Sequence, residues 1–146
     1  MAGRLVGIAR THERLGPMEE IAHASVSVEA GIDGDVRGTK PGRQVTVLFR
    51  EGWDDACEGL GIALPWTTRR ANLLVEGVVR PRAIGGHIVI GEVELRVEDQ
   101  TKPCQLMEQA QTGLFQALKP DWRGGVCCTV LRGGRLQTGD VVRLEP

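Results

Sequence analysis

Aromatic side chains are scarce in this sequence. They make up 3% of the 146 residues, and there is no tyrosine. A platform that stacks single-stranded nucleic acid needs exposed rings at intervals, so this composition argues against one. The formal net charge of −1 supplies no overall field that would attract nucleic acid or an anionic membrane. Anion binding therefore has to come from a local cluster of basic side chains.

Long apolar runs are also missing. The sequence contains no stretch of about 20 apolar residues that could form a membrane-spanning helix. Near the start, the apolar stretch between Arg4 and Arg10 is too short for the hydrophobic region of a signal peptide. We therefore expect a cytoplasmic protein, not associated with a membrane, whose cysteines stay reduced.

Cysteine patterns typical of zinc sites do not occur. The four cysteines include no C-x-x-C pair, and the three histidines lie far from every cysteine in the sequence. A structural zinc ion usually takes closely spaced Cys and His ligands, so none is expected here.

Glycine, in contrast, is abundant. Its 20 occurrences are about twice the average usage, and they separate short apolar runs as turns do in a β-rich protein. The length fits one domain covering residues 1–146. We predict a mainly β fold, similar to a β-barrel, with a few short helices packed at its ends.

Alternation of apolar and polar residues marks the individual strands. Val93, Leu95 and Val97 should face the core from one strand, with residues 87–90 as its partner across a turn at 91–92. Shorter patterns predict half-buried strands around residues 26–28 and 45–49. Near the end, residues 128–131 and 141–144 resemble a closing pair, with the Gly-Gly at 133–134 as its hairpin turn.

Two segments have helical spacing. Apolar residues at 53, 57 and 60 predict a helix that ends at Gly59 or Gly61. A second helix is predicted to begin at Pro103, with apolar residues at 106, 110, 114 and 118. Gly113 lies in its middle and can divide it into two short pieces.

Cys104 is the strongest candidate for a reactive residue. It follows a strand and is predicted to lie in the first turn of a helix, where free backbone N–H groups favour a thiolate. Lys102 adds positive charge nearby, so the thiolate should form more readily than in a free cysteine. The alternative is a buried structural cysteine. Of the others, Cys57 is predicted to be core, and the neighbours Cys127 and Cys128 should point to opposite faces of a strand, one into the core and one to solvent or a cleft.

Two segments offer donors for an anion. Arg70 and Asn72, two apart in an apparently extended segment, would project on the same side. Arg123 precedes two glycines whose backbone N–H groups can approach a ligand closely. Solvated surface arginines are the alternative reading of either segment. In the Asp/Gly-rich loop at 32–38, Asp35 is expected to order the backbone around it, because the spacing of a calcium loop is missing.

Taken in order, several short motifs resemble the MOSC domain, a family named for the C-terminal domain of molybdenum cofactor sulfurase. The resemblance runs from about residue 31 to 142 and depends on the order of the segments GIDGD (31–35), RQV (43–45), RANL with EG (70–77), GEV (91–93), Pro103-Cys104 and the region 134–141. It implies a β-barrel fold. It also implies that Cys104 carries sulfur as a persulfide or binds molybdenum, and that Arg70 and Asn72 help to bind the pterin of the molybdenum cofactor. Arg37 stands where many relatives have His, which weakens any transfer of that loop's role.

Three functions follow as hypotheses. The first is a molybdenum-cofactor enzyme that reduces N-hydroxylated compounds, with Cys104 as metal ligand and the polar residues Arg70, Asn72, Lys102 and Arg123 around the cofactor. The second is a sulfur carrier in which Cys104 takes up a persulfide and passes it on. Its partners would be sulfur donor or acceptor proteins, such as a cysteine desulfurase, whereas the enzyme would need a redox partner. The third is a non-catalytic binding module that merely retains the cysteine.

Overall fold

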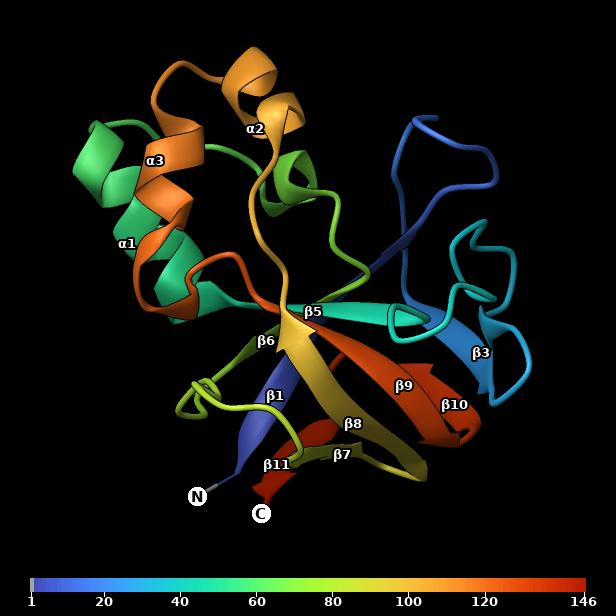
Figure 1. The fold of residues 1–146 in the computed structure, drawn as a ribbon. Coiled ribbons are helices and arrows are strands. Elements are labelled where there is room, and N and C mark those ends of the chain that lie inside the picture. The colour runs from blue at the N-terminus through green and yellow to red at the C-terminus, as the bar shows by residue number, and fades with distance from the viewer. Residues whose placement is uncertain (1) are drawn as a thin grey trace.

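Seven strands close into a mixed β-barrel in the computed structural model, which describes residues 2–146 (Figure 1). Around the barrel they follow the order β1, β6, β5, β9, β8, β7 and β11, and β11 pairs with β1 to close the ring. All neighbouring pairs are antiparallel except β5 and β6. The bounds of these strands are β1 Gly3–Arg10, β5 Val45–Phe49, β6 Leu73–Glu76, β7 His87–Ile90, β8 Val93–Gln100, β9 Val126–Arg132 and β11 Val141–Glu145.

Four further strands lie outside this ring. β2 (Glu19–Ile21) pairs with the end of β1. β10 (Gly134–Gln137), β3 (His23–Ser27) and β4 (Gly31–Ile32) form a small separate sheet. The helices are α1 (Arg50–Leu60), α2 (Gln105–Ala110) and α3 (Leu114–Leu118), with 3-10 turns η1 (Trp66–Arg69) and η2 (Pro120–Trp122). No helix within residues 2–146 is long and apolar enough to cross a membrane.

The interior of the barrel is the main hydrophobic core. Val93, Leu95 and Val97 of β8 are at most 1% exposed, as their alternation predicts, and the polar residues between them are half-buried. β7 pairs with β8 across the turn at residues 91–92, which confirms the predicted hairpin. The prediction of a mainly β, barrel-like fold with a few short helices is therefore confirmed.

A second hydrophobic cluster lies between the helices and the outer face of β5 and β6. Leu48, Trp53, Cys57 and Leu114 are members of this cluster. Every residue of β5 is consequently buried, whereas its sequence predicted a half-buried strand. Alternation detects one covered face, and the layer of helices that covers the other face comes from distant parts of the chain. Figure 1 shows this layer on one side of the barrel.

Both predicted helical segments are present, but the predicted apolar face of the second is wrong at positions 106 and 110. Cys57 is buried on α1, and Gly61 ends this helix in the left-handed conformation with φ of 67°. The second predicted helix is divided at Gly113, whose φ of 90° is strained for any other residue, into α2 and α3. α2 begins at Gln105 instead of Pro103, and it buries Met107 while residues 106 and 110 are exposed.

The predicted closing hairpin near the C-terminus is wrong. β9 pairs with β5 and β8, whereas β11 pairs with β7 and β1. The chain at 133–134 leaves the barrel for the small sheet, where β10 pairs with β3. A Cβ at Gly133 would overlap the carbonyl oxygen of Val26, so glycine here permits close contact between strands and forms no tight turn.

Candidate functional site

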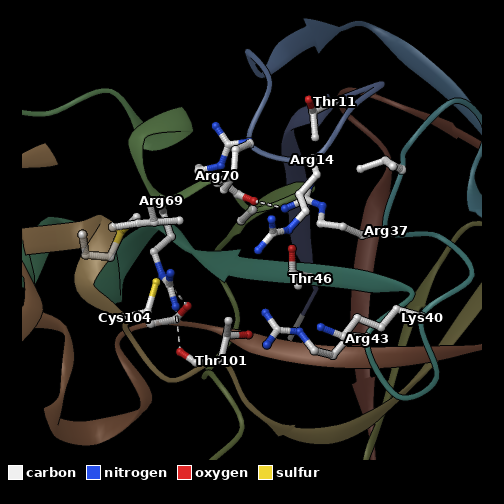
Figure 2. A pocket seen from close by; sticks show the side chains of 16 residues that line it. Thr11, Arg14, Arg37, Lys40, Arg43, Thr46, Arg69, Arg70, Thr101 and Cys104 are labelled. Atoms are coloured by element: carbon white, nitrogen blue, oxygen red, sulfur yellow. Dashed lines mark hydrogen bonds between the residues drawn. The ribbon is translucent and has the colours of Figure 1, made fainter. Parts of the chain in front are cut away.

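A pocket of about 420 Å³ opens beside the helices, on the outer face of β5. Its walls come from the β1–β2 loop, the loop between β4 and β5, the η1 segment and the start of α2. Figure 2 shows it with Thr46 of β5 at its centre. The lining residues are Thr11, Arg14, Leu15, Val36, Arg37, Lys40, Arg43, Thr46, Arg69, Arg70, Ala71, Thr101, Cys104, Leu106, Met107 and Gly124.

Cys104 lines this pocket and is exposed, whereas the other three cysteines are buried. It occupies the N-cap position of α2, one residue before the predicted first turn, and its carbonyl oxygen accepts a hydrogen bond of 3.0 Å from the N–H of Met107. The thiol is thus held at the edge of a structured wall while its sulfur remains open to the cavity.

The pocket is strongly basic although the chain as a whole has a net charge of −1. Six of its lining residues are cationic, and none of the lining residues within 2–146 is acidic. Arg14, Lys40 and Arg43 form no side-chain hydrogen bond or ion pair with any residue from 2 to 146. In Figure 2, Lys40 and Arg43 lie at the end of the pocket away from Cys104. These side chains are available to an anion.

Arg69 is the buried cation next to Cys104 (Figure 2). Only 7% of its surface is exposed, and its guanidinium donates to the carbonyl oxygens of Gly124 (3.1 Å) and Thr101 (2.7 Å). Burial lowers the pKa of Arg69 to about 10, while the neighbouring sulfur of Cys104 acts in the opposite direction. At neutral pH the guanidinium therefore stays charged, and it connects three walls of the pocket.

Thr101 carries an unused hydrogen-bonding group. The residue is 8% exposed, and its Oγ1 has no hydrogen-bond partner among the described residues. In Figure 2 this side chain lies between Cys104 and Arg43. Buried hydroxyls are nearly always paired, so an unpaired one in a pocket wall indicates a place for a ligand atom.

Of the predicted pair, Arg70 lines the pocket together with Cys104, and Asn72 does not. Arg70 lines the pocket and donates to the carbonyl oxygen of Gly16 (2.7 Å). Burial, followed by the charge of Arg37, lowers its pKa. The segment is not extended, because Arg70 ends η1 in the left-handed conformation with φ of 65°, so the two side chains do not project on one side.

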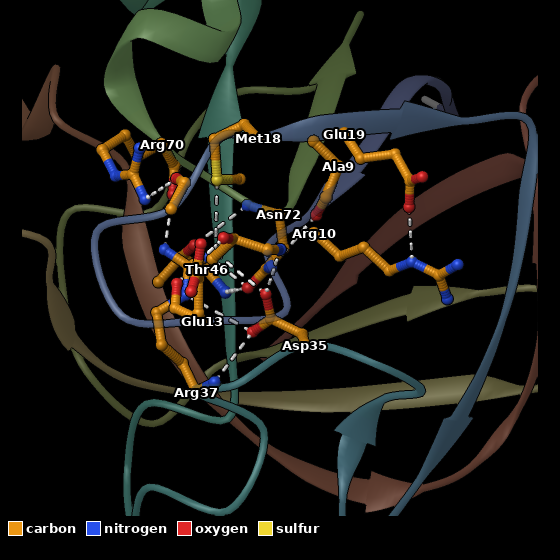
Figure 3. Close-up of polar contacts among 12 residues, drawn as sticks. Ala9, Arg10, Glu13, Met18, Glu19, Asp35, Arg37, Thr46, Arg70 and Asn72 are labelled. Atoms are coloured by element: carbon orange, nitrogen blue, oxygen red, sulfur yellow. Dashed lines mark hydrogen bonds and ion pairs between the residues drawn. The ribbon is translucent and has the colours of Figure 1, made fainter.

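Asn72 lies outside the pocket lining, and its side chain joins three strands. Its Oδ1 accepts from the backbone N–H of Thr46 (3.0 Å), and its Nδ2 donates to the carbonyl oxygen of Ala9 (3.1 Å), as Figure 3 shows. It is 1% exposed. In this structure Asn72 therefore positions Thr46 and the start of β6.

Lys102 and Arg123 also lie outside the lining. Lys102 is exposed, and Arg123 donates to the carbonyl oxygen of Ala117 (3.1 Å), with its Nε left without a partner among the described residues. Gly124 does reach the pocket, as the sequence suggested for this loop.

Asp35 orders its loop as expected. Its fully buried carboxylate accepts from the backbone N–H of Thr11 (3.0 Å) and pairs with Arg37 (3.1 Å). Arg37 also donates to the carbonyl oxygen of Arg70 (2.7 Å), so the loop is tied to the η1 segment (Figure 3). Arg37 therefore places a cation in the pocket wall, where its bonds to Asp35 and to the carbonyl oxygen of Arg70 hold it.

The neighbouring cysteines of β9 point to opposite faces, as predicted. Cys128 faces the barrel core, and burial raises its pKa. Cys127 faces outward, but it too is buried: its Sγ lies 3.5 Å from the carbonyl oxygen of Asp99, and burial raises its pKa. The expectation that one of the two reaches solvent or a cleft is wrong, because Cys127 is only 6% exposed and is absent from the pocket lining.

The residues that the sequence did not identify are Arg14, Lys40, Arg43, Arg69 and Thr101. The first three stand in polar loops where nothing local distinguishes a ligand-binding cation from a solvated one. The burial of Arg69 depends on carbonyl groups that are 32 and 55 residues away. No signal in a single sequence indicates such contacts.

Comparisons with known proteins agree with this fold. The solved structures similar to this chain include the YuaD protein from Bacillus subtilis, at a TM-score of 0.82 and 18% identity, with 99% of this chain and 96% of that chain covered. YiiM from Escherichia coli has a TM-score of 0.70 at 17% identity, covering 98% of this chain and 70% of its own. YiiM from Geobacillus stearothermophilus has the same TM-score and identity, with 99% and 73% covered.

At these identities the structures establish the fold alone. No curated protein matches the sequence. The model of the MOSC domain, however, matches residues 33–143, which is most of the chain, so this protein belongs to the MOSC domain family.

Proposed function

We propose that the pocket binds a molybdenum–pterin cofactor through its phosphate, with the Cys104 thiolate as a ligand of the metal. The observation that carries this proposal is an exposed thiol opening into a pocket with six cationic side chains. Thiolates are suitable soft ligands for such a metal centre, and Arg and Lys are the usual partners of phosphate. No group of three or more His, Cys, Asp or Glu that could hold a metal occurs among residues 2–146, so the pterin would have to supply further ligands.

The residues of the pocket fit such a group. Arg14, Lys40 and Arg43 would hold the phosphate, because their charges are not used by the protein. The unpaired Oγ1 of Thr101 supplies a donor between this cationic end and the thiol. Arg70 adds a cation on a further wall.

The bound cofactor would supply electron transfer to an N–O bond, and the proposed reaction is the reduction of N-hydroxylated compounds. Reduction of N–OH to N–H consumes two electrons and two protons and releases water, so a redox partner protein is needed. Within the chain, Arg69 keeps the walls around Cys104 in place, and Asp35 with Arg37 orders the loop opposite.

The test is metal and pterin analysis of protein purified from a host that makes the cofactor. We expect molybdenum and pterin in the wild type, loss of molybdenum in Cys104→Ser, and weaker pterin retention in Arg43→Gln. Arg143→Gln is the matched control, because Arg143 is an exposed cation on β11 outside the pocket. Absence of both molybdenum and pterin from the wild type would contradict the proposal.

A sulfur carrier is the second candidate, and the accessibility of the cysteines favours it. Persulfide formation requires an accessible thiol, and Cys104 is the exposed one of the four cysteines. A carrier needs no metal, so a labile sulfur on Cys104 in metal-free protein would favour this function over the reductase.

A further inference from the structure

We propose that Cys104 takes sulfane sulfur directly from small dianionic donors of the thiosulfate class, which the basic pocket binds. This inference depends on the second candidate function, the sulfur carrier. It adds a donor that is a small molecule in place of a desulfurase protein.

The charge of the pocket selects for a dianion. Of its six cations, Arg37 is paired with a carboxylate, and Arg69 and Arg70 donate only to uncharged carbonyl groups. The remaining three cations have no protein partner among the described residues. An anion that enters the cavity therefore meets positive charge from several walls at once, and a neutral donor gains nothing from it.

Donors for a sulfonate group lie on the same side of the cavity as the thiol. The unpaired Oγ1 of Thr101 is buried between Cys104 and Arg43 in the view of Figure 2. Arg69 uses Nε and Nη2 for its two carbonyl partners, and its Nη1 has no hydrogen-bond partner within residues 2–146. A sulfonate oxygen can accept from such hydroxyl and guanidinium groups, which places the outer sulfur of the donor toward Cys104.

The wall next to Cys104 suits a soft sulfur atom. Met107, which is 2% exposed, and Leu106 line the pocket in the first turn after the cysteine. A sulfane sulfur is polarisable and weakly hydrated, so contact with a thioether and an aliphatic side chain costs little desolvation. The pocket therefore offers a polar side for the sulfonate and an apolar side for the transferred sulfur.

The reaction balances without an added oxidant or reductant. The Cys104 thiol releases its proton to solvent, and the thiolate attacks the outer sulfur of thiosulfate. A new S–S bond forms on Cys104, the S–S bond of thiosulfate breaks, and sulfite leaves with the electron pair. The products are a cysteine persulfide and sulfite, with the same total charge as the reactants. A nucleophilic acceptor such as cyanide then removes the outer sulfur as thiocyanate and regenerates the thiolate.

The experiment loads metal-free protein with thiosulfate and follows persulfide by intact mass, as a gain of about 32 Da for one sulfur atom. Thiocyanate released by cyanide gives a second readout. We expect loading of the wild type, none of Cys104→Ser, and a loading rate in Arg43→Gln lowered about tenfold, because one of the three cations that are unpaired within residues 2–146 and attract the dianion is removed. Arg143→Gln, a cation outside the pocket, should load like the wild type.

Two comparisons separate recognition of the anion from general thiol reactivity. Alkylation of Cys104 by iodoacetamide, a neutral reagent, should proceed in Arg43→Gln within about twofold of the wild-type rate, because the lost charge attracts only an anion. Thr101→Val removes a hydroxyl that has no protein partner, so the fold should be unharmed while loading from thiosulfate slows several-fold.

The outcomes distinguish this inference from the carrier function beneath it. Loading by a cysteine desulfurase but not by thiosulfate would overturn the inference and leave the carrier intact. Loading by neither would remove both. Equal loading of wild type and Arg43→Gln by thiosulfate would also overturn the inference, because the basic pocket would then play no part in choosing the donor.

Discussion

Arg69 connects the elements that hold the reactive thiol, and replacing it tests how much the pocket contributes to stability. Arg69→Met keeps an unbranched side chain of similar length but removes both hydrogen bonds, to Thr101 and to Gly124. The carbonyl oxygens that accept these bonds belong to the end of β8 and to the loop before β9. The substitution therefore removes contacts that hold the segment before Cys104 and α2 in place.

The magnitude follows from two opposing contributions. Hydrogen bonds that involve a charged group contribute about 1.5–3 kcal/mol each to folding. Burial of the guanidinium opposes this, and the lowering of the Arg69 pKa from 12.5 to about 10 corresponds to about 3 kcal/mol. The two bonds together contribute about 3–6 kcal/mol, so subtracting about 3 leaves a net loss of up to about 3 kcal/mol for Arg69→Met, and we expect about 2 kcal/mol.

Urea denaturation followed by circular dichroism measures this loss. With an m value of about 2 kcal/mol per M, the midpoint should fall by about 1 M. Arg70→Met is the matched control, since Arg70 loses one bond to a loop carbonyl and is less buried, so its midpoint should fall by less than half as much. An Arg69→Met midpoint within about 0.2 M of wild type, which is close to the error of the method, would refute the reasoning, because water would then satisfy both carbonyl groups at no cost.

Three further predictions address the thiol, a surface ion cluster and a close backbone contact. Iodoacetamide should label Cys104 well before Cys57, because the first is exposed and the second is buried on α1, and peptide mapping over time will show whether the order is reversed. Arg82, with a smaller effect of Arg80, lowers the pKa of Asp121 to about 2 from 3.8, so the stability that this carboxylate contributes should be present above about pH 4 and lost as the pH falls toward 2. Wild type and Asp121→Asn should accordingly converge in acid melting curves, and a constant gap between them would contradict this origin. Gly124→Ala should destabilise the protein by at least about 2 kcal/mol, because its Cβ would overlap the carbonyl oxygen of Thr101, whereas Gly59→Ala on α1 meets open space and should be neutral or stabilising by thermal melting.

Patterns carried by a single element were predictable from the sequence. The alternation of β8 identified its buried face, and the turn at 91–92 identified its partner, because both depend only on residues close together in the chain. The same holds for the glycine that ends α1. The β11 pairings were not predictable, because the pattern of a strand shows which of its faces is apolar but not which strands pair with it.

The candidate site shows the same division. Cys104 was identified from its local setting, and its exposure agrees with a reactive role. The sequence could not show which of the adjacent Arg69 and Arg70 would be buried. The 3-10 turn that buries Arg69 and leaves Arg70 more exposed depends on contacts with residues 101 and 124. Asn72 belongs to a motif of the family, yet its side-chain amide forms hydrogen bonds with backbone groups of neighbouring strands. These bonds depend on the assembled barrel and cannot be seen in the sequence.

The pairing of β11 with both β1 and β7 also sets the order of events during synthesis. Until residues 141–145 leave the ribosome, the start of β1 and the outer edge of β7 lack the strand that covers them. Unpaired strand edges are sites of misassociation between nascent chains. The earlier strands can pair among themselves, but the ring stays open until its last member arrives. Substitutions in β11 should therefore reduce the yield of folded protein in cells more than their effect on the stability of the finished barrel would indicate.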